Sequence, residues 1–146
     1  MSAVAVERPS SSEAIKSLFP DQNILSPSGY LSAVRKGLSG DQLRVITDVL
    51  GSRELVARTI GKEVSNLSRS YRVKVLPEST TDSIIGTLRV YMQAVDIYQS
   101  EELAQEWLNS PIPALGGEVP SKLLNTDAGR ELVRQTLHKM AYGEYV

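Results

Sequence analysis

The 146-residue chain contains no cysteine, which excludes disulfide bonds, thiolate zinc sites and cysteine nucleophiles. Its one histidine, His138, is too little for a pair of histidine metal ligands or a conventional catalytic triad. Aromatic residues make up only 5% of the chain, so aliphatic side chains must fill the core. These absences argue against an enzyme, and we expect neither a metal nor a cofactor.

Long apolar runs are also missing from the sequence. No stretch approaches the length that crosses a bilayer, and the first residues lack the basic and then apolar order of a signal peptide. Hydrophobic residues at 41% and charged residues at 23% are the balance of a globular protein. The sequence therefore predicts a soluble, folded, cytoplasmic protein.

The net charge of −1 conceals an uneven distribution. Residues 35–76 hold nine Lys and Arg against four Asp and Glu, a net charge of +5. Residues 77–146 hold five against ten, a net charge of −5. This asymmetry is typical of a half that faces nucleic acid beside an acidic half, although a chance division of surface charge explains it equally well.

Proline, glycine and serine residues that end helices or mark turns divide the chain into four regions. The regions between them are expected to be helical, with no convincing pair of strands, so the sequence predicts an all-α fold. Residues 1–25 are expected to form a flexible arm with one short helix candidate at 13–18. Residues 26–77 are expected to hold short helices, the first at 30–38, and residues 78–99 one long connecting helix. Residues 100–146 are expected to hold two helices, 101–108 and 127–141, joined by a proline-rich stretch too apolar to be a free linker.

A helix-turn-helix is predicted within the second region. Ser52 caps a helix that ends at Gly61, and a polar and basic helix follows from Glu63 to about Val73. This order is typical of a DNA-binding unit whose second helix enters the major groove, although helix pairs unrelated to DNA share it. The residues expected to contact DNA are Lys62, Ser65, Asn66, Ser68, Arg69 and Arg72.

The long helix and the C-terminal region offer little chemistry. The apolar stripe of the long helix is interpreted as core, and its members are Ile84, Ile85, Leu88, Tyr91, Met92 and Val95. Glu102 and Glu106 lie four residues apart, but such carboxylates are more often a solvated helix face. Gly116-Gly117 before Ser121-Lys122 is a poor phosphate loop, since Pro120 removes a backbone donor.

An ordered series of residues runs through the C-terminal third of the chain. Its members are Ala104, Trp107-Leu108, Pro111, Leu115-Gly116-Gly117, Pro120, Leu123-Leu124, Thr126, Gly129, Val133, Leu137 and Tyr142-Gly143-Glu144-Tyr145. This series resembles the toxin-binding domain of the Xre, MbcA and ParS antitoxins, the partners of RES-domain toxins. Residues from about 37 to 98 look like the Xre-type helix-turn-helix region of the same family.

Physical reasons support the glycines and the tryptophan of this series. Gly116 and Gly117 permit a sharp turn between two helices. Trp107 is large enough to anchor that connection. Gly129 leaves room for the close approach of another backbone, or serves simple packing.

The resemblance implies an antitoxin that neutralises an NAD-consuming RES toxin by covering its active site with the C-terminal domain. NAD is then the toxin's substrate and not a cofactor of this chain. The resemblance further implies a homodimer that binds its own operator DNA and represses the shared operon, alone and within a larger toxin–antitoxin complex.

The residues expected at the toxin are Trp107, Leu115, Gly116, Gly117, Tyr142, Gly143, Glu144, Tyr145 and Val146. We expect the tail with its two tyrosines to reach into the active-site cleft, because tyrosine offers apolar area and a hydroxyl at low entropic cost. A frayed terminus is the plain alternative for the tail.

Two other readings of the whole chain stay open. The first is a stand-alone helix-turn-helix regulator whose C-terminal half dimerises or senses a signal. The second is an adaptor that binds a protein but no DNA.

Overall fold

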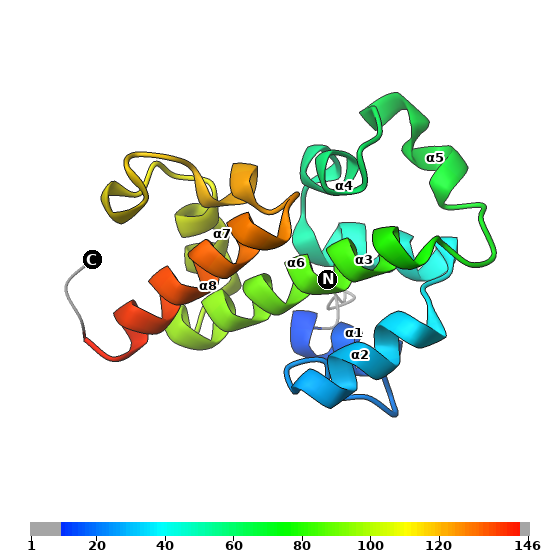
Figure 1. Cartoon of the computed structure of the whole chain (residues 1–146), viewed down its shortest axis with the longest axis horizontal. Coiled ribbons are helices and arrows are strands. Elements are labelled where there is room, and N and C mark those ends of the chain that lie inside the picture. Colours follow the sequence, from blue (N-terminus) through cyan, green and yellow to red (C-terminus); the bar gives the residue numbers. More distant parts are fainter. Residues whose placement is uncertain (1–9, 144–146) are drawn as a thin grey trace, which may run out of the picture.

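The computed structural model describes residues 10–143, and all regular elements within them are helices, which confirms the predicted all-α fold. Figure 1 shows their arrangement. The α-helices are α1 (Ser11–Leu18), α2 (Pro27–Lys36), α3 (Gly40–Leu50), α4 (Arg53–Ile60), α5 (Leu67–Ser70), α6 (Glu78–Tyr98), α7 (Glu101–Leu108) and α8 (Asp127–Ala141). The short 3₁₀-helices are η1 (Val64–Asn66), η2 (Pro113–Leu115) and η3 (Pro120–Leu123).

Local capping explains where most of these helices begin and end. Ser52, Ser100 and Thr126 each accept a hydrogen bond from a backbone N–H in the first turn of α4, α7 and α8. The bounds predicted for these three helices are confirmed. The α2 helix begins three residues earlier than predicted, because Pro27 takes its first position, where a missing N–H has no cost.

The helix predicted over 63–73 is wrong in its second half. The structure replaces it with η1 and the short α5, and the chain then leaves the helix. The N–H of Gly40 donates to the carbonyl of Val73 at 2.8 Å, and the N–H of Leu76 donates to the carbonyl of Leu38 at 2.7 Å. Residues 73–76 therefore run beside residues 38–40, and this tertiary pairing ends the helix early.

The N-terminal region is not a flexible arm over its whole predicted length. Ile15, Phe19 and Ile24 are buried in the core at 4%, 7% and 2% exposure. The N–H of Ser11 donates to the carboxylate of Glu101 at 2.8 Å, which fixes the start of α1 to α7. The flexible arm predicted over 1–25 is therefore wrong from Ser11 onwards, whereas the short helix predicted at 13–18 is present as α1. Residues 1–9 lie outside the described range.

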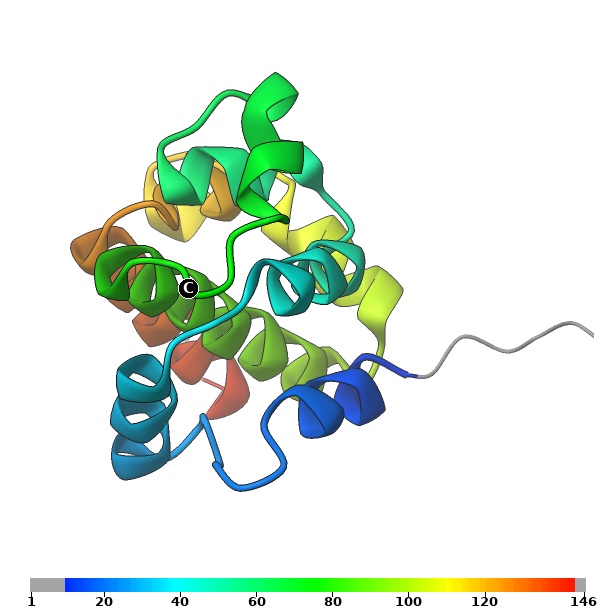
Figure 2. The same cartoon turned by 90° about the vertical axis from the view of Figure 1, so that its right-hand side faces the viewer.

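Helix α6 runs through the middle of the molecule and packs against α2, α4, α7 and α8 (Figures 1 and 2). Its five consecutive residues 84–88 are all buried, which requires neighbours on every side. Of the apolar stripe predicted for this helix, Met92 and Val95 are only partly buried. The region with the predicted DNA-binding residues and the C-terminal region thus share one core along α6.

Polar contacts also join these two regions. The side-chain amide of Gln105 on α7 donates to the carbonyl of Leu50 at the end of α3, at 2.7 Å. The Arg58 guanidinium on α4 donates to the carbonyl of Ser121 in η3, at 3.1 Å. Each contact satisfies a backbone carbonyl near a helix end. The first places α7, and the second places the loop before α8, next to helices that precede α6.

Gly129, in the first turn of α8, lies against another segment of backbone. A Cβ at this position would stand 1.8 Å from the carbonyl oxygen of Leu123, far inside van der Waals contact. The close approach expected from the sequence is present, and only glycine fits it without displacing η3.

We predict that Gly129→Ala lowers the free energy of unfolding by about 1–3 kcal/mol, because the methyl group forces the η3 backbone away from α8. Urea unfolding of the purified protein, followed by circular dichroism, measures this loss. Gln135→Ala, at an exposed position of the same helix, is the control and should change stability by less than about 0.5 kcal/mol. Equal midpoints for Gly129→Ala and wild type would show that the contact does not constrain the fold.

Candidate functional site

The turn between α4 and α5 is the centre of the predicted helix-turn-helix. Gly61 adopts a φ of 70°, the left-handed conformation that glycine accepts most easily. The N–H groups of Gly61 and Lys62 donate to carbonyls of the last turn of α4, the latter to Ala57 at 2.9 Å. These bonds close α4 and send the chain into η1 and α5 at a fixed angle.

The second part of this unit has one buried anchor and an open outer surface. Leu67 is fully buried, whereas the predicted DNA-contacting residues are all exposed. Those residues are Lys62, Ser65, Asn66, Ser68, Arg69 and Arg72. None of the three cations among them has a carboxylate within 4 Å in residues 10–143. Figure 1 places α5 at the outer edge of the molecule, where a long partner can approach it.

A tyrosine fixes the base of this unit. The hydroxyl of Tyr71, just after α5, donates to the hydroxyl of Thr47 on α3 at 3.1 Å. The guanidinium of Arg44 lies 5.1 Å from the centre of the Tyr71 ring, within range of a cation–π interaction. Both partners of Tyr71 come from α3, so no pattern within the α4–α5 unit itself could have shown these contacts.

The connection between α7 and α8 is packed down, as the sequence predicted. Gly116 and Gly117 have φ values of 67° and 83° and are exposed at its tip. The N–H of Gly117 donates to the carbonyl of Ile112 at 3.0 Å, which closes a compact turn. Trp107 and Leu115 are buried at 9% and 7% exposure beneath this turn. They anchor the connection and lie too deep to offer much surface to a partner.

The C-terminal end of α8 is exposed, unlike the buried side chains beneath the glycine turn. Tyr142 is 72% exposed, and its ring lies 4.5 Å from the ring of His138 one turn earlier. Gly143 follows with a φ of 69°. Glu144, Tyr145 and Val146, also predicted at the toxin, lie outside the described residues. Figure 1 shows the glycine turn and the end of α8 at the same end of the molecule, away from α5.

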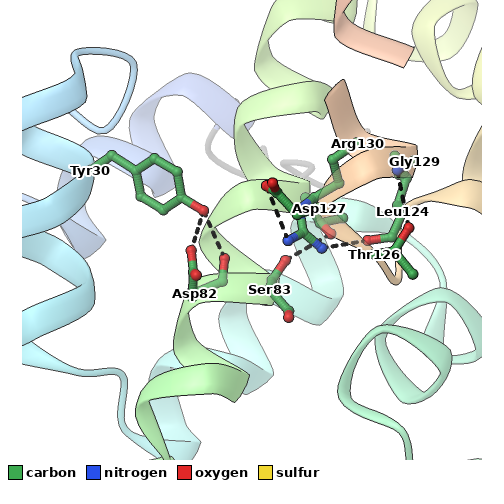
Figure 3. Close-up of polar contacts among 9 residues, drawn as sticks. Tyr30, Asp82, Ser83, Leu124, Thr126, Asp127, Gly129 and Arg130 are labelled. Carbon is green, nitrogen blue, oxygen red and sulfur yellow. Dashed lines mark hydrogen bonds and ion pairs between the residues drawn. The ribbon is translucent and has the colours of Figure 1, made fainter. Parts of the chain in front are cut away.

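Two polar contacts on α6 were not anticipated from the sequence (Figure 3). The hydroxyl of Tyr30 on α2 donates to the carboxylate of Asp82 near the start of α6. Burial, reinforced by this hydrogen bond and by the negative charge of Asp82, raises the pKa of Tyr30 to about 12. The neutral phenol is therefore the form that the fold stabilises.

The second contact involves a buried arginine. Arg130 on α8 is only 7% exposed and donates to the carbonyl of Leu124 at 2.9 Å (Figure 3). Its guanidinium passes over Gly86, where a Cβ would lie 2.7 Å from Nε. Asp127, 3.8 Å away, supplies the opposite charge. The signal available in the sequence was Gly86 itself, a glycine inside a long helix that needs a packing reason.

The residues weighed for catalysis do not assemble into one site. Glu102 and Glu106 are exposed on α7, and His138 is exposed on α8. Within residues 10–143, no group of three histidine or acidic side chains gathers closely enough to hold a metal ion. In the same range, no helix has both the length and the apolar character that crossing a membrane requires.

Comparison with known proteins identifies a family that matches the C-terminal part of the chain. Residues 93–143 match the family described as the antitoxin Xre/MbcA/ParS C-terminal toxin-binding domain. The family resemblance inferred from the sequence is thereby confirmed for residues 93–143, a segment that begins within α6.

The similarity to one relative extends well beyond that domain. The chain is 26% identical over 142 residues to a protein of Sphingobium sp. (strain YBL2) named Prs ADP-ribosylating antitoxin. The match covers 82% of each protein. The likeness to an antitoxin thus includes most of the region that precedes the toxin-binding domain.

We predict that Tyr30→Phe lowers the free energy of unfolding at neutral pH by about 1 kcal/mol, because the hydrogen bond to Asp82 is lost while the ring stays. The unfolded chain releases the tyrosine proton near pH 10. Because the folded pKa is higher, the contribution of Tyr30 is complete below pH 10 and is lost as the pH rises towards 12. The stability difference between wild type and variant should therefore shrink across that interval.

Urea unfolding of both proteins at neutral pH and between pH 10 and 12 measures this difference. Tyr98→Phe is the control at neutral pH, because the Tyr98 hydroxyl has no hydrogen bond within the described residues. A constant difference between wild type and Tyr30→Phe at all pH values would contradict the assignment.

Proposed function

We propose that this protein is an antitoxin that neutralises a cognate RES-domain toxin by covering the toxin's active site with residues 93–143. The observation that carries the proposal is the match of this segment to an antitoxin toxin-binding domain. In support, the glycine turn and the exposed Tyr142 lie at one end of the molecule. Trp107 and Leu115 contribute by holding the turn in shape from below, and the tail after Gly143 reaches across the toxin's cleft.

The name of the relative supports the reaction proposed for the toxin. That protein is named for ADP-ribosylation of Prs, and ADP-ribosyl transfer takes its ADP-ribose from NAD. We therefore assign NAD to the toxin as its substrate. The antitoxin performs no catalysis in this proposal and acts in the cytoplasm by occupying the site where the toxin binds NAD.

The same protein is proposed to bind its operator as a homodimer and to repress the operon. In support, the polar and basic residues predicted at DNA are all exposed around α5, and Leu67 fixes them from below. Dimeric helix-turn-helix proteins place two such units one helical turn of DNA apart. Because α5 and the end of α8 lie apart in Figure 1, one molecule has room for DNA and toxin together.

We predict that Tyr142→Ala, and deletion of residues 143–146, weaken toxin binding by about 2 kcal/mol or more each, the loss expected for an anchor at the centre of an interface. Toxin affinity of the purified proteins, and growth and cellular NAD in cells that co-express the toxin, measure the effect. Tyr142→Phe retains most of the contact area and is the matched control. Full protection by both the alanine variant and the truncated protein would reject the tail as an active-site element.

We predict a different pattern for the residues around α5. Arg69→Ala should cost about 1–3 kcal/mol at the operator if this side chain reads a base edge. Arg72→Ala should reduce the slope of log affinity against log salt by roughly one, as the loss of one phosphate contact requires. Titration of the DNA upstream of the gene at several salt concentrations measures both, with toxin binding as the control.

Lys122→Ala removes an exposed lysine from η3 and is the control for net charge. If Arg69→Ala binds the operator at full strength, α5 is not the reading helix.

A further inference from the structure

A groove lies between α6, α8 and the segment that joins α1 to α2. It contains two hollows of about 720 and 570 Å³, and both are lined by Arg89, Gln93 and Arg134. The larger hollow extends under the start of α1, and the smaller one extends along α8 to His138 and Lys139. These three residues are the ones that the hollows have in common, and the two arginines are the only charged side chains among them.

Arg89 is held in place by an aromatic ring. Its guanidinium carbon lies 4.3 Å from the centre of the Tyr30 ring, a cation–π distance. One terminal nitrogen donates a long hydrogen bond of 3.4 Å to the carbonyl of Leu25. The Nε atom is buried and has no acceptor within residues 10–143. A guanidinium that lies flat on a ring keeps its N–H edge available for a planar or tetrahedral anion.

Arg134 is held by a glutamine on the facing helix. Its Nε donates to Oε1 of Gln93 at 3.4 Å, and the Gln93 amide donates back to the Arg134 carbonyl at 3.1 Å. This reciprocal pair fixes the side chain towards α6. The remaining N–H groups of Arg134 form no hydrogen bond within the described residues.

The acidic residues near the groove form no ion pair with these arginines within residues 10–143. Neither Arg89 nor Arg134 has a carboxylate within 4 Å in the described part of the chain. Asp82, Glu101 and Glu131 instead accept hydrogen bonds from neutral side chains. Burial first, and then the charge of Arg134, lower the pKa of Arg89, whereas the charges of Tyr30, Glu131 and Asp82 act in the opposite direction. An anion between them would relieve this repulsion.

We infer that the groove is a binding site for a phosphate group, either free or as part of a nucleotide, held by Arg89 and Arg134. A phosphate presents several charged oxygens and accepts from two guanidinium groups at once. The hollows leave room for the molecule that carries the phosphate, and His138 and Lys139 add donors along α8. The hollow reaches His138, whose ring lies 4.5 Å from that of Tyr142, but the test below measures phosphate binding alone and needs neither the proposed toxin nor the operator.

The test uses the full-length protein and three probes: inorganic phosphate, pyrophosphate and AMP, with ionic strength held constant by sodium chloride. The Tm is followed by calorimetry, and the Arg Nε–Hε resonances by NMR. We expect a saturable rise in Tm at millimolar phosphate and a shift of the Arg89 resonance, because a ligand that binds only the folded state stabilises it. A tighter response to AMP or pyrophosphate than to phosphate would identify a nucleotide as the source, whereas equal responses would identify free phosphate.

Phosphate also stabilises proteins in general, because it is excluded from the protein surface. Variants distinguish binding at the groove from this general effect. Arg134→Gln removes the positive charge but keeps a donor on a shorter side chain, and should raise the Kd at least tenfold. Arg89→Lys should do the same and serves as the second variant if the first is unstable. Lys122→Ala, in η3, should leave the Kd unchanged. The inference is wrong if no probe gives a saturable response, or if Arg134→Gln and Arg89→Lys respond as wild type does.

Discussion

The burial of five consecutive residues in the middle of α6 governs the arrangement of the other helices. A helix with one apolar stripe needs neighbours on one side only, whereas residues 84–88 point in every direction around the helix axis. The chain meets this requirement by placing α2 and α4 from one half and α7 and α8 from the other around the same helix. Each half therefore depends on the other for a complete core, which explains why polar contacts from Arg58 and Gln105 also cross between them.

Local signals in the sequence were enough to predict most helices but not how they pack. The capping serines Ser52 and Ser100 set the starts of α4 and α7, and Gly61 sets the end of α4, because each acts within one turn. The early end of α5 depends on hydrogen bonds to residues 38–40, more than thirty positions away, which no local pattern contains. The burial of α1 was missed for a similar reason, since Ile15 and Phe19 are too few to reveal a partner surface.

In the candidate sites too, features set by nearby residues were predictable from the sequence, and features that depend on tertiary contacts were not. Exposure of the polar residues around α5 was predictable, because they surround a single apolar anchor, Leu67. The burial of Trp107 and Leu115 agrees with the predicted anchoring of this connection, but a series of residue types cannot distinguish a side chain that contacts a partner from one that shapes a turn. The Arg89 and Arg134 groove lay beyond sequence reasoning altogether, since its residues come from two helices that are adjacent only in the folded chain.

The passage of Arg130 over Gly86 has a consequence for how the length of this chain can vary. One residue inserted into α6 after Gly86 would rotate the rest of the helix by about 100° and carry Gln93 away from Arg134. The helical register between α6 and α8 therefore tolerates no insertion or deletion. The turn at Gly116 and Gly117 has no heavy atom within 4 Å of where a Cβ would stand, so additional residues can extend there into solvent. Related chains of different length should differ at this turn, where the molecule can acquire a new partner preference without rebuilding its core.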